Sequence, residues 1–179
     1  MNLLKLWYDR LRGYLLGKIS DKNLDNQAVA VSVALPSGYS TPKPPVGVKE
    51  SRNLDDCEPE LVDQYRKVKE EFAASTGMTL FETTTWRSKE RQIELYAQGR
   101  TKPGEVVTYI DGIKSRSRHN FYPSQAIDVA IDVDPGPGKV VVWDDKLYSP
   151  LGPLCLKHKL IWGGDFLQFK DYCHIQMKA

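Results

Sequence analysis

The sequence predicts an α+β domain in which a small sheet is flanked by helices. Three observations support this class. One segment has apolar residues at helical spacing, another alternates apolar and polar residues, and no repeated strand–helix–strand order indicates a parallel sheet. The 179 residues are 41% hydrophobic and 27% charged, as in ordinary globular proteins. The net charge of +2 and the lack of a dense basic block argue against a nucleic-acid partner.

Residues 1–56 are predicted to form an N-terminal extension. An apolar stripe at helical spacing predicts an amphipathic helix over residues 1–19. We expect it to pack against its own protein or a partner, and membrane-surface binding is the less favoured alternative. Residues 28–35 can form a strand, and the prolines between 36 and 47 indicate an extended linker.

The compartment can be inferred from the first residues and from the cysteines. Charged residues at positions 5, 9, 10 and 12 interrupt the apolar core that a secretory signal peptide needs. No run approaches the length of a membrane span. The three cysteines are widely spaced, which argues against a disulfide framework. We therefore expect synthesis and folding in the cytoplasm, with delivery by another route.

Residues 57–179 are predicted to form the folded domain, which begins with a helix. Pro59 suits a first helical turn and Gly77 suits the end of that helix. The apolar stripe between them is Leu61, Tyr65, Val68 and Phe72. Residues 78–85 can form a strand, Ser88 can cap a helix that extends to about Gln98, and a short strand is expected at 106–109.

The segment 126–133 alternates and predicts a strand. Its isoleucines and valines take one face, so Asp128 leaves the buried face and points toward an open one. A turn at 134–138, a strand at 139–143, a helix at about 149–159 and a final strand at 174–177 complete the domain.

Two short stretches carry residues that suit a metal site. His119 and Asp128 lie in the first, and Asp171 and His174 lie in the second. A catalytic zinc site needs three protein ligands, an open position and a nearby base, and these four residues can supply them. The spacing alone leaves the ordinary alternative open, in which His119 and Asp128 form a structural pair and Asp171 is a solvated carboxylate. His158 follows apolar residues at helical spacing and is expected to be a packing histidine.

The motif order resembles a known family. Ser-x-His at 117–119, Ala-x-Asp at 126–128, Trp-Gly-Gly-Asp at 162–165 and Asp-x-x-His at 171–174 are similar to the zinc D-Ala-D-Ala carboxypeptidase and L-alanyl-D-glutamate peptidase family, which includes many phage endolysins. The similarity extends upstream through Trp86-Arg-Ser88, Gln92 and residues 95–104, and covers about residues 59–179. It implies a hedgehog/DD-peptidase-like domain with a small antiparallel sheet.

The resemblance also implies roles for individual residues. His119, Asp128 and His174 would bind Zn2+, and Asp171 would be the general base. Arg87 would bind a substrate carboxylate or the developing oxyanion. From the residues alone, a surface salt bridge is the ordinary alternative for Arg87.

Three further residues would contact substrate. Ser117 lies near the first ligand, while Trp162 and Asp165 would form a wall of the cleft, although a simple tight turn is an alternative for residues 162–165. The chain departs from the family pattern at Cys173, where proline is usual, and at Gln176, where an acid often stands.

The expected function is zinc-dependent hydrolysis of the peptidoglycan stem peptide, at the L-alanyl-D-glutamate bond in preference to D-Ala-D-Ala. A phage-type lysin or a virion component would act on the cell wall, outside the cytoplasm. Residues 1–56 would then dock the enzyme onto a protein partner such as a phage particle. The alternative is a catalytically silent metal- or protein-binding module of the same fold, as in the hedgehog signalling domain. The complete set of metal and base positions favours the enzyme.

Overall fold

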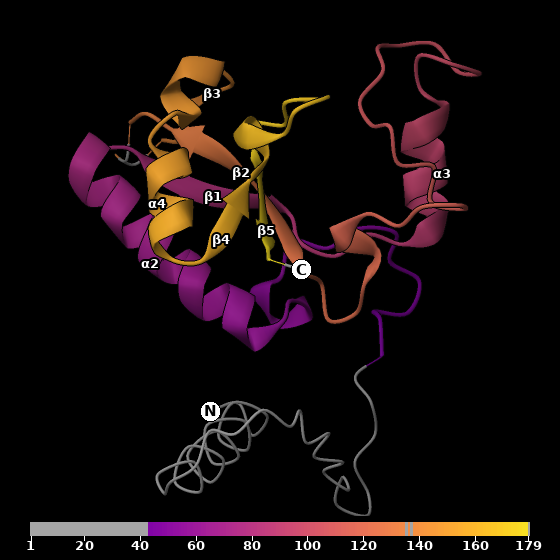
Figure 1. Cartoon of the computed structure of the whole chain (residues 1–179), viewed down its shortest axis with the longest axis horizontal. Helices are drawn as coiled ribbons and strands as arrows, with labels where there is room; N and C mark the ends of the chain where they lie inside the picture. The colour runs from indigo at the N-terminus through magenta and orange to yellow at the C-terminus, as the bar shows by residue number, and fades with distance from the viewer. Residues whose placement is uncertain (1–42, 135, 137, 179) are drawn as a thin grey trace, which may run out of the picture. The chain divides into compact units, whose positions relative to one another are not determined.

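The computed structural model describes residues 43–134, 136 and 138–178 (Figure 1). The chain divides into two units, residues 1–41 and residues 42–179. The helix predicted over residues 1–19 and the strand predicted over 28–35 lie outside the described residues. The domain boundary expected near residue 56 stays a prediction.

A five-stranded antiparallel sheet forms the centre of the second unit (Figure 1). Its main path runs β1 (Thr79–Thr84), β2 (Ala126–Asp132), β5 (His174–Met177) and β4 (Leu160–Trp162), and β3 (Val141–Val142) also pairs with β2. β1 pairs along one edge of β2, while β5 and β3 share the other edge. The antiparallel sheet and its helices confirm the predicted α+β class.

Two helices cover one face of this sheet. α2 (Pro59–Thr76) and α4 (Leu151–Lys157) contact each other and the strands β1 and β4. Figure 1 shows α3 (Lys89–Ala97) at the far end of the domain from this pair. The core between helices and sheet is apolar, and its fully buried members include Leu61, Tyr65, Val68, Phe72, Ile127, Val129, Ile131, Leu151 and Ile175. Burial of each such side chain stabilises the fold by about 1.5–3 kcal/mol. Because strand residues alternate between the two faces of a sheet, the face opposite this core is the one that can carry polar groups.

The predicted helix ends are confirmed by their caps. α2 ends at Gly77, whose φ of 72° is left-handed and therefore suits glycine. α3 begins after Ser88, whose side chain accepts a hydrogen bond from the backbone N–H of Arg91. Four short 3-10 helices complete the described elements: η1 (Leu54–Asp56), η2 (Arg118–Asn120), η3 (Asp145–Tyr148) and η4 (Gly163–Asp165). Among the helices that the structure describes, none combines the length and apolarity needed to cross a membrane.

The strand expected at 106–109 was a wrong prediction, because these described residues form a loop instead. The reason is that side chains satisfy the backbone there. The Gln92 amide donates to the carbonyl of Ile110 (2.8 Å), and Arg100 donates to the carbonyl of Thr108 (3.0 Å). The loop is therefore held against α3 rather than added to the sheet.

An extended segment before α2, here called the strap (residues 49–57), packs beside the end of β1. Ser51 donates its backbone N–H to the carbonyl of Trp86 (2.8 Å) and accepts from the N–H of Thr85 (2.7 Å). Asp56, which is buried, accepts a hydrogen bond from the Ser51 hydroxyl. The strap is thus bonded to the residues that connect β1 with α3.

Candidate metal centre

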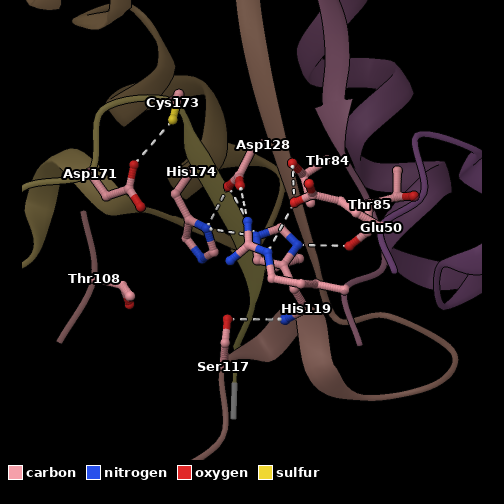
Figure 2. A network of polar contacts seen from close by, with 12 residues as sticks. Glu50, Thr84, Thr85, Thr108, Ser117, His119, Asp128, Asp171, Cys173 and His174 are labelled. Carbon is pink, nitrogen blue, oxygen red and sulfur yellow. Dashed lines mark hydrogen bonds and ion pairs between the residues drawn. The ribbon is translucent and has the colours of Figure 1, made fainter. Parts of the chain in front are cut away.

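Three side chains that can bind a metal converge on one face of the sheet (Figure 2). The neighbours of Asp128 in β2, Ile127 and Val129, belong to the apolar core, so this face is the one opposite α2 and α4. His119 comes from η2, Asp128 from the middle of β2 and His174 from the start of β5. Asp128 and His174 are register partners, so their side chains lie on the same face of the sheet. His119 Nε2 lies 3.0 Å from Asp128 Oδ1, and His174 Nδ1 lies 2.9 Å from the same oxygen. The two nitrogens are 3.2 Å apart.

This spacing fits a zinc ion. Zinc bonds of about 2.0–2.1 Å in a tetrahedron place the ligand atoms about 3.3 Å from one another. The three observed separations, 2.9 to 3.2 Å, are close to that value. Two imidazoles and one carboxylate are also among the donor types that zinc prefers.

The second ring nitrogen of each histidine has its own acceptor. His119 Nδ1 lies 2.7 Å from the carbonyl oxygen of Thr85, and His174 Nε2 lies 3.1 Å from Oε1 of Gln176. Since a carbonyl oxygen can only accept, these ring nitrogens donate, and in a neutral ring the other nitrogen is the one whose lone pair is available to a metal. Gln176 therefore fills the position where an acid is usual with a neutral acceptor.

The centre is electrostatically coupled. Burial alone would raise the pKa of Asp128, but the charges and hydrogen bonds of His119 and His174 outweigh it and hold that pKa well below its usual range. Burial alone would lower the pKa of His174, but the hydrogen bond and charge of Asp128 raise it. The carboxylate thus stays ionised, as a metal ligand must be.

Arg87 lies beside this carboxylate. Its Nη2 donates to Asp128 Oδ2 (3.3 Å), its Nη1 to Gln92 Oε1 (3.1 Å) and its Nε to Glu50 Oε1 (3.1 Å). The side chain is only 12% exposed. Among the described residues these contacts engage three of its five N–H groups, which leaves two for another ligand. The ion pairs of Arg87 are therefore part of the centre rather than of the outer surface.

Asp171 borders the centre from the loop between η4 and β5. One ligand atom each of Asp128, Asp171 and Cys173 lie within 4.8 Å of one another. The Cys173 thiol donates to Asp171 Oδ1 at 3.1 Å. Burial, together with the negative charges of Asp128 and Asp171, raises the pKa of Cys173, so the thiol keeps the proton that it donates.

The three residues predicted to contact substrate occupy different places. Ser117 caps η2, since its hydroxyl accepts from the backbone N–H of His119 (3.3 Å). Trp162 is buried and donates its indole N–H to the carbonyl of Tyr172 (2.7 Å), and Asp165 is exposed at the end of η4. Both line a hollow beside α4 whose described lining includes neither histidine of the centre nor Asp128. Their contact with substrate stays a prediction.

His158 lies elsewhere. Its Nε2 is 2.9 Å from a carboxylate oxygen of Glu71 on α2, so it joins two helices as a boundary histidine.

Two contributors to the centre had no signal in the sequence. Glu50 is a single acid in an extended segment that was assigned to the N-terminal extension. Thr85 acts through its backbone carbonyl, which every residue type possesses. The pairing of the strap with residues 85–88 brings Glu50 to the centre, and Thr85 lies there because it directly follows β1, whose last residue is opposite Asp128.

Comparison with known proteins gives three matches. A family model described as D-alanyl-D-alanine carboxypeptidase, of the M15 peptidases, matches residues 111–177. The chain is 33% identical over 126 residues to the peptidoglycan L-alanyl-D-glutamate endopeptidase CwlK of Bacillus subtilis. The alignment covers 65% of this chain and 71% of that protein. The fold of this chain is similar to that of the Serratia marcescens L-Ala D-Glu endopeptidase ChiX, with a TM-score of 0.50 and 23% sequence identity. The structural match covers 70% of this chain and 84% of ChiX. The chain therefore belongs to the M15 peptidase family.

Proposed function

We propose that this protein is a zinc-dependent peptidase that hydrolyses the L-alanyl-D-glutamate bond of peptidoglycan stem peptides. One observation carries the proposal, namely the convergence of His119, Asp128 and His174 beside the carboxylate of Asp171. The name of the curated relative supports the choice of bond. The description of the family model makes the D-Ala-D-Ala bond the second candidate.

His119, Asp128 and His174 would hold Zn2+ through Nε2, a carboxylate oxygen and Nδ1. A zinc ion bound there supplies a Lewis acid and lowers the pKa of a coordinated water to about 7. The carbonyl of Thr85 and the amide of Gln176 keep the two imidazoles in the required tautomers.

Asp171 acts as the general base in this proposal. The Cys173 thiol holds its Oδ1, so Oδ2 is the oxygen that takes a proton from the attacking water. The same carboxyl group then gives that proton to the leaving amine. Arg87 directs its two remaining N–H groups toward a substrate carboxylate or toward the negative charge that develops on the scissile carbonyl.

The test is digestion of purified Gram-negative and Gram-positive peptidoglycan, with product identification by mass spectrometry. New N-terminal D-glutamate, lost with a chelator and restored by Zn2+, supports the proposal. Released D-alanine identifies a carboxypeptidase instead. If neither product forms from either wall although the protein binds zinc, the silent binding module is the better description.

We further propose that the protein acts as a phage-type lysin on the cell wall, and that residues 1–56 attach it to a protein partner such as a phage particle. The order of motifs shared with phage endolysins supports this. Removal of residues 1–41 keeps the strap in place and leaves the second unit whole. Loss of co-sedimentation with phage particles, with digestion unchanged, is expected. Unchanged co-sedimentation would contradict the docking role.

A further inference from the structure

We propose that Glu50, on the strap, is a positioning residue that orients Arg87 toward the centre. This inference rests on the function proposed above, because it concerns how that site is held. The strap lies outside the segment that resembles the peptidase family and outside the residues matched by the family model. Glu50 would therefore add a positioning residue to the site from a part of the chain that has no assigned role in the chemistry.

Glu50 uses both carboxylate oxygens. Its Oε1 accepts from Arg87 Nε (3.1 Å) and from the Thr84 hydroxyl (3.2 Å), and its Oε2 accepts from Arg91 Nε (3.3 Å). The backbone of Glu50 also forms a bridge with that of Arg87. The donation of the Ser88 N–H to the Lys49 carbonyl (2.8 Å) fixes the strap on the other side. The carboxylate is therefore presented to Arg87 by a paired backbone.

The contact with Nε decides where the rest of the guanidinium points. Because the group is planar and rigid, holding Nε and Nη1 fixes the direction of every other N–H. Nη1 is held by Gln92, which is fully buried. Without the Glu50 carboxylate, the guanidinium of Arg87 would keep, among the described residues, its hydrogen bonds with Gln92 and Asp128. The guanidinium could then turn toward Asp128 and pair with both of its oxygens.

Such a turn would harm the site in two ways. The two N–H groups left for substrate would point elsewhere, and Arg87 would compete with the metal for the oxygens of Asp128. Glu50 opposes this because it shares the positive charge of Arg87 with Asp128. Glu50, Arg87 and Asp128 thus form a carboxylate–arginine–carboxylate series, in which Glu50 sets the orientation of Arg87 beside Asp128.

Glu94 offers a matched control on the same surface. Among the described residues it forms ion pairs with Lys49 and Arg91, and it forms no ion pair or hydrogen bond with Arg87. Glu94→Gln therefore disturbs the strap and Arg91 without changing the support of Arg87. Glu50→Gln keeps an acceptor oxygen for Arg87 Nε and removes the charge, so it should lose less activity than Glu50→Ala.

The kinetic test is a double-mutant cycle on peptidoglycan fragments with Arg87→Lys as the second background. Loss of an outer partner of this kind typically costs about 10–100-fold, and we expect that loss in kcat for Glu50→Ala, with Glu94→Gln near wild type. Because Glu50 acts through Arg87, its removal should cost less than about threefold in the Arg87→Lys background. An equal loss in both backgrounds, or no loss in either, overturns the proposal.

A second measurement needs no substrate. The Nε–H resonance of Arg87 in nitrogen-correlated NMR reports its hydrogen bond to Glu50. We expect slow exchange with water in the wild type and in Glu94→Gln, and exchange at least about tenfold faster in Glu50→Ala. Unchanged exchange in Glu50→Ala overturns the proposal even if the variant is inactive. If the wild type cleaves no wall, the proposed function fails, and this resonance still decides whether Glu50 positions Arg87.

Discussion

Substitution of Gly163 by alanine should damage the centre although it replaces none of the side chains that form it. The carbonyl oxygen of Gly163 accepts a hydrogen bond from the backbone N–H of Asp171 (3.0 Å), so the two backbones are in close contact. A Cβ on Gly163 would lie 2.3 Å from the carbonyl oxygen of Asp171 and 2.9 Å from Cβ of His174. Ordinary contacts begin at about 3.4 Å, so the carbonyl must move by about 1 Å. The backbone N–H of His174 bonds that same carbonyl, so the base and one histidine would shift together.

A displacement of about 1 Å at a reacting group can reduce catalysis by about 100-fold. Overpacking of this kind also costs about 1–3 kcal/mol of stability. We therefore expect Gly163→Ala to lower kcat/KM on peptidoglycan fragments by about 100-fold. Its urea midpoint should also fall.

The matched control is Gly138→Ala, since a Cβ there meets no atom of the described residues within 4 Å and its φ is not left-handed. It should change neither activity nor stability. If folded Gly163→Ala protein keeps wild-type kcat/KM and wild-type zinc affinity, the close approach of the Gly163 and Asp171 backbones does not contribute to activity, and this prediction is refuted.

Three further predictions follow from the same structure. Asp171→Asn should lower kcat by about 10²–10⁴-fold with zinc content unchanged by metal analysis, because it removes the proposed general base, while the exposed Asp145→Asn should have no effect. Removal of metal by a chelator should lower the thermal midpoint and Zn2+ should restore it, since a ligand at about 100-fold its Kd stabilises by about 2.7 kcal/mol; an unchanged midpoint would contradict a metal bound to the folded state. Although burial raises the pKa of Glu82, several hydrogen bonds, the one from Lys69 first among them, together with the charge of Lys69 outweigh it and hold that pKa below its usual value. The unfolded chain then binds more protons than the folded chain in the acid range, so the free energy of unfolding falls as the pH drops through the folded-state pKa of Glu82. Lys69→Gln should make this fall shallower, as measured by urea midpoints from about pH 6 to about pH 3.

Local sequence patterns are sufficient to specify the elements that depend on interactions between near neighbours in the chain. The apolar stripe of Leu61 to Phe72 and the glycine that follows specify α2, and the alternation around Asp128 specifies β2. The same alternation put Asp128 on the face opposite the apolar core, and it is the most exposed residue of β2. The loop at 106–109 was misread, because its β-branched residues indicate a strand while side chains of α3 and the loop after it satisfy its backbone.

The sequence also contained the donor types of the centre, but not their distances. His119 and His174 are 55 residues apart along the chain, and their nitrogens approach to 3.2 Å because β5 pairs with β2 and η2 folds over the same face. The tautomer of His119 depends on a backbone carbonyl that every residue has, so no sequence pattern marks it.

Tertiary structure alone decided the part played by the strap. A glutamate in an extended segment has no periodicity to interpret, and Glu50 reaches Arg87 only because the strap pairs with residues 85–88. Local sequence patterns report which face of an element is buried, because burial follows the repeat of a helix or strand. Contacts between distant segments depend on how the elements pack together, and that packing placed two carboxylates on either side of one arginine.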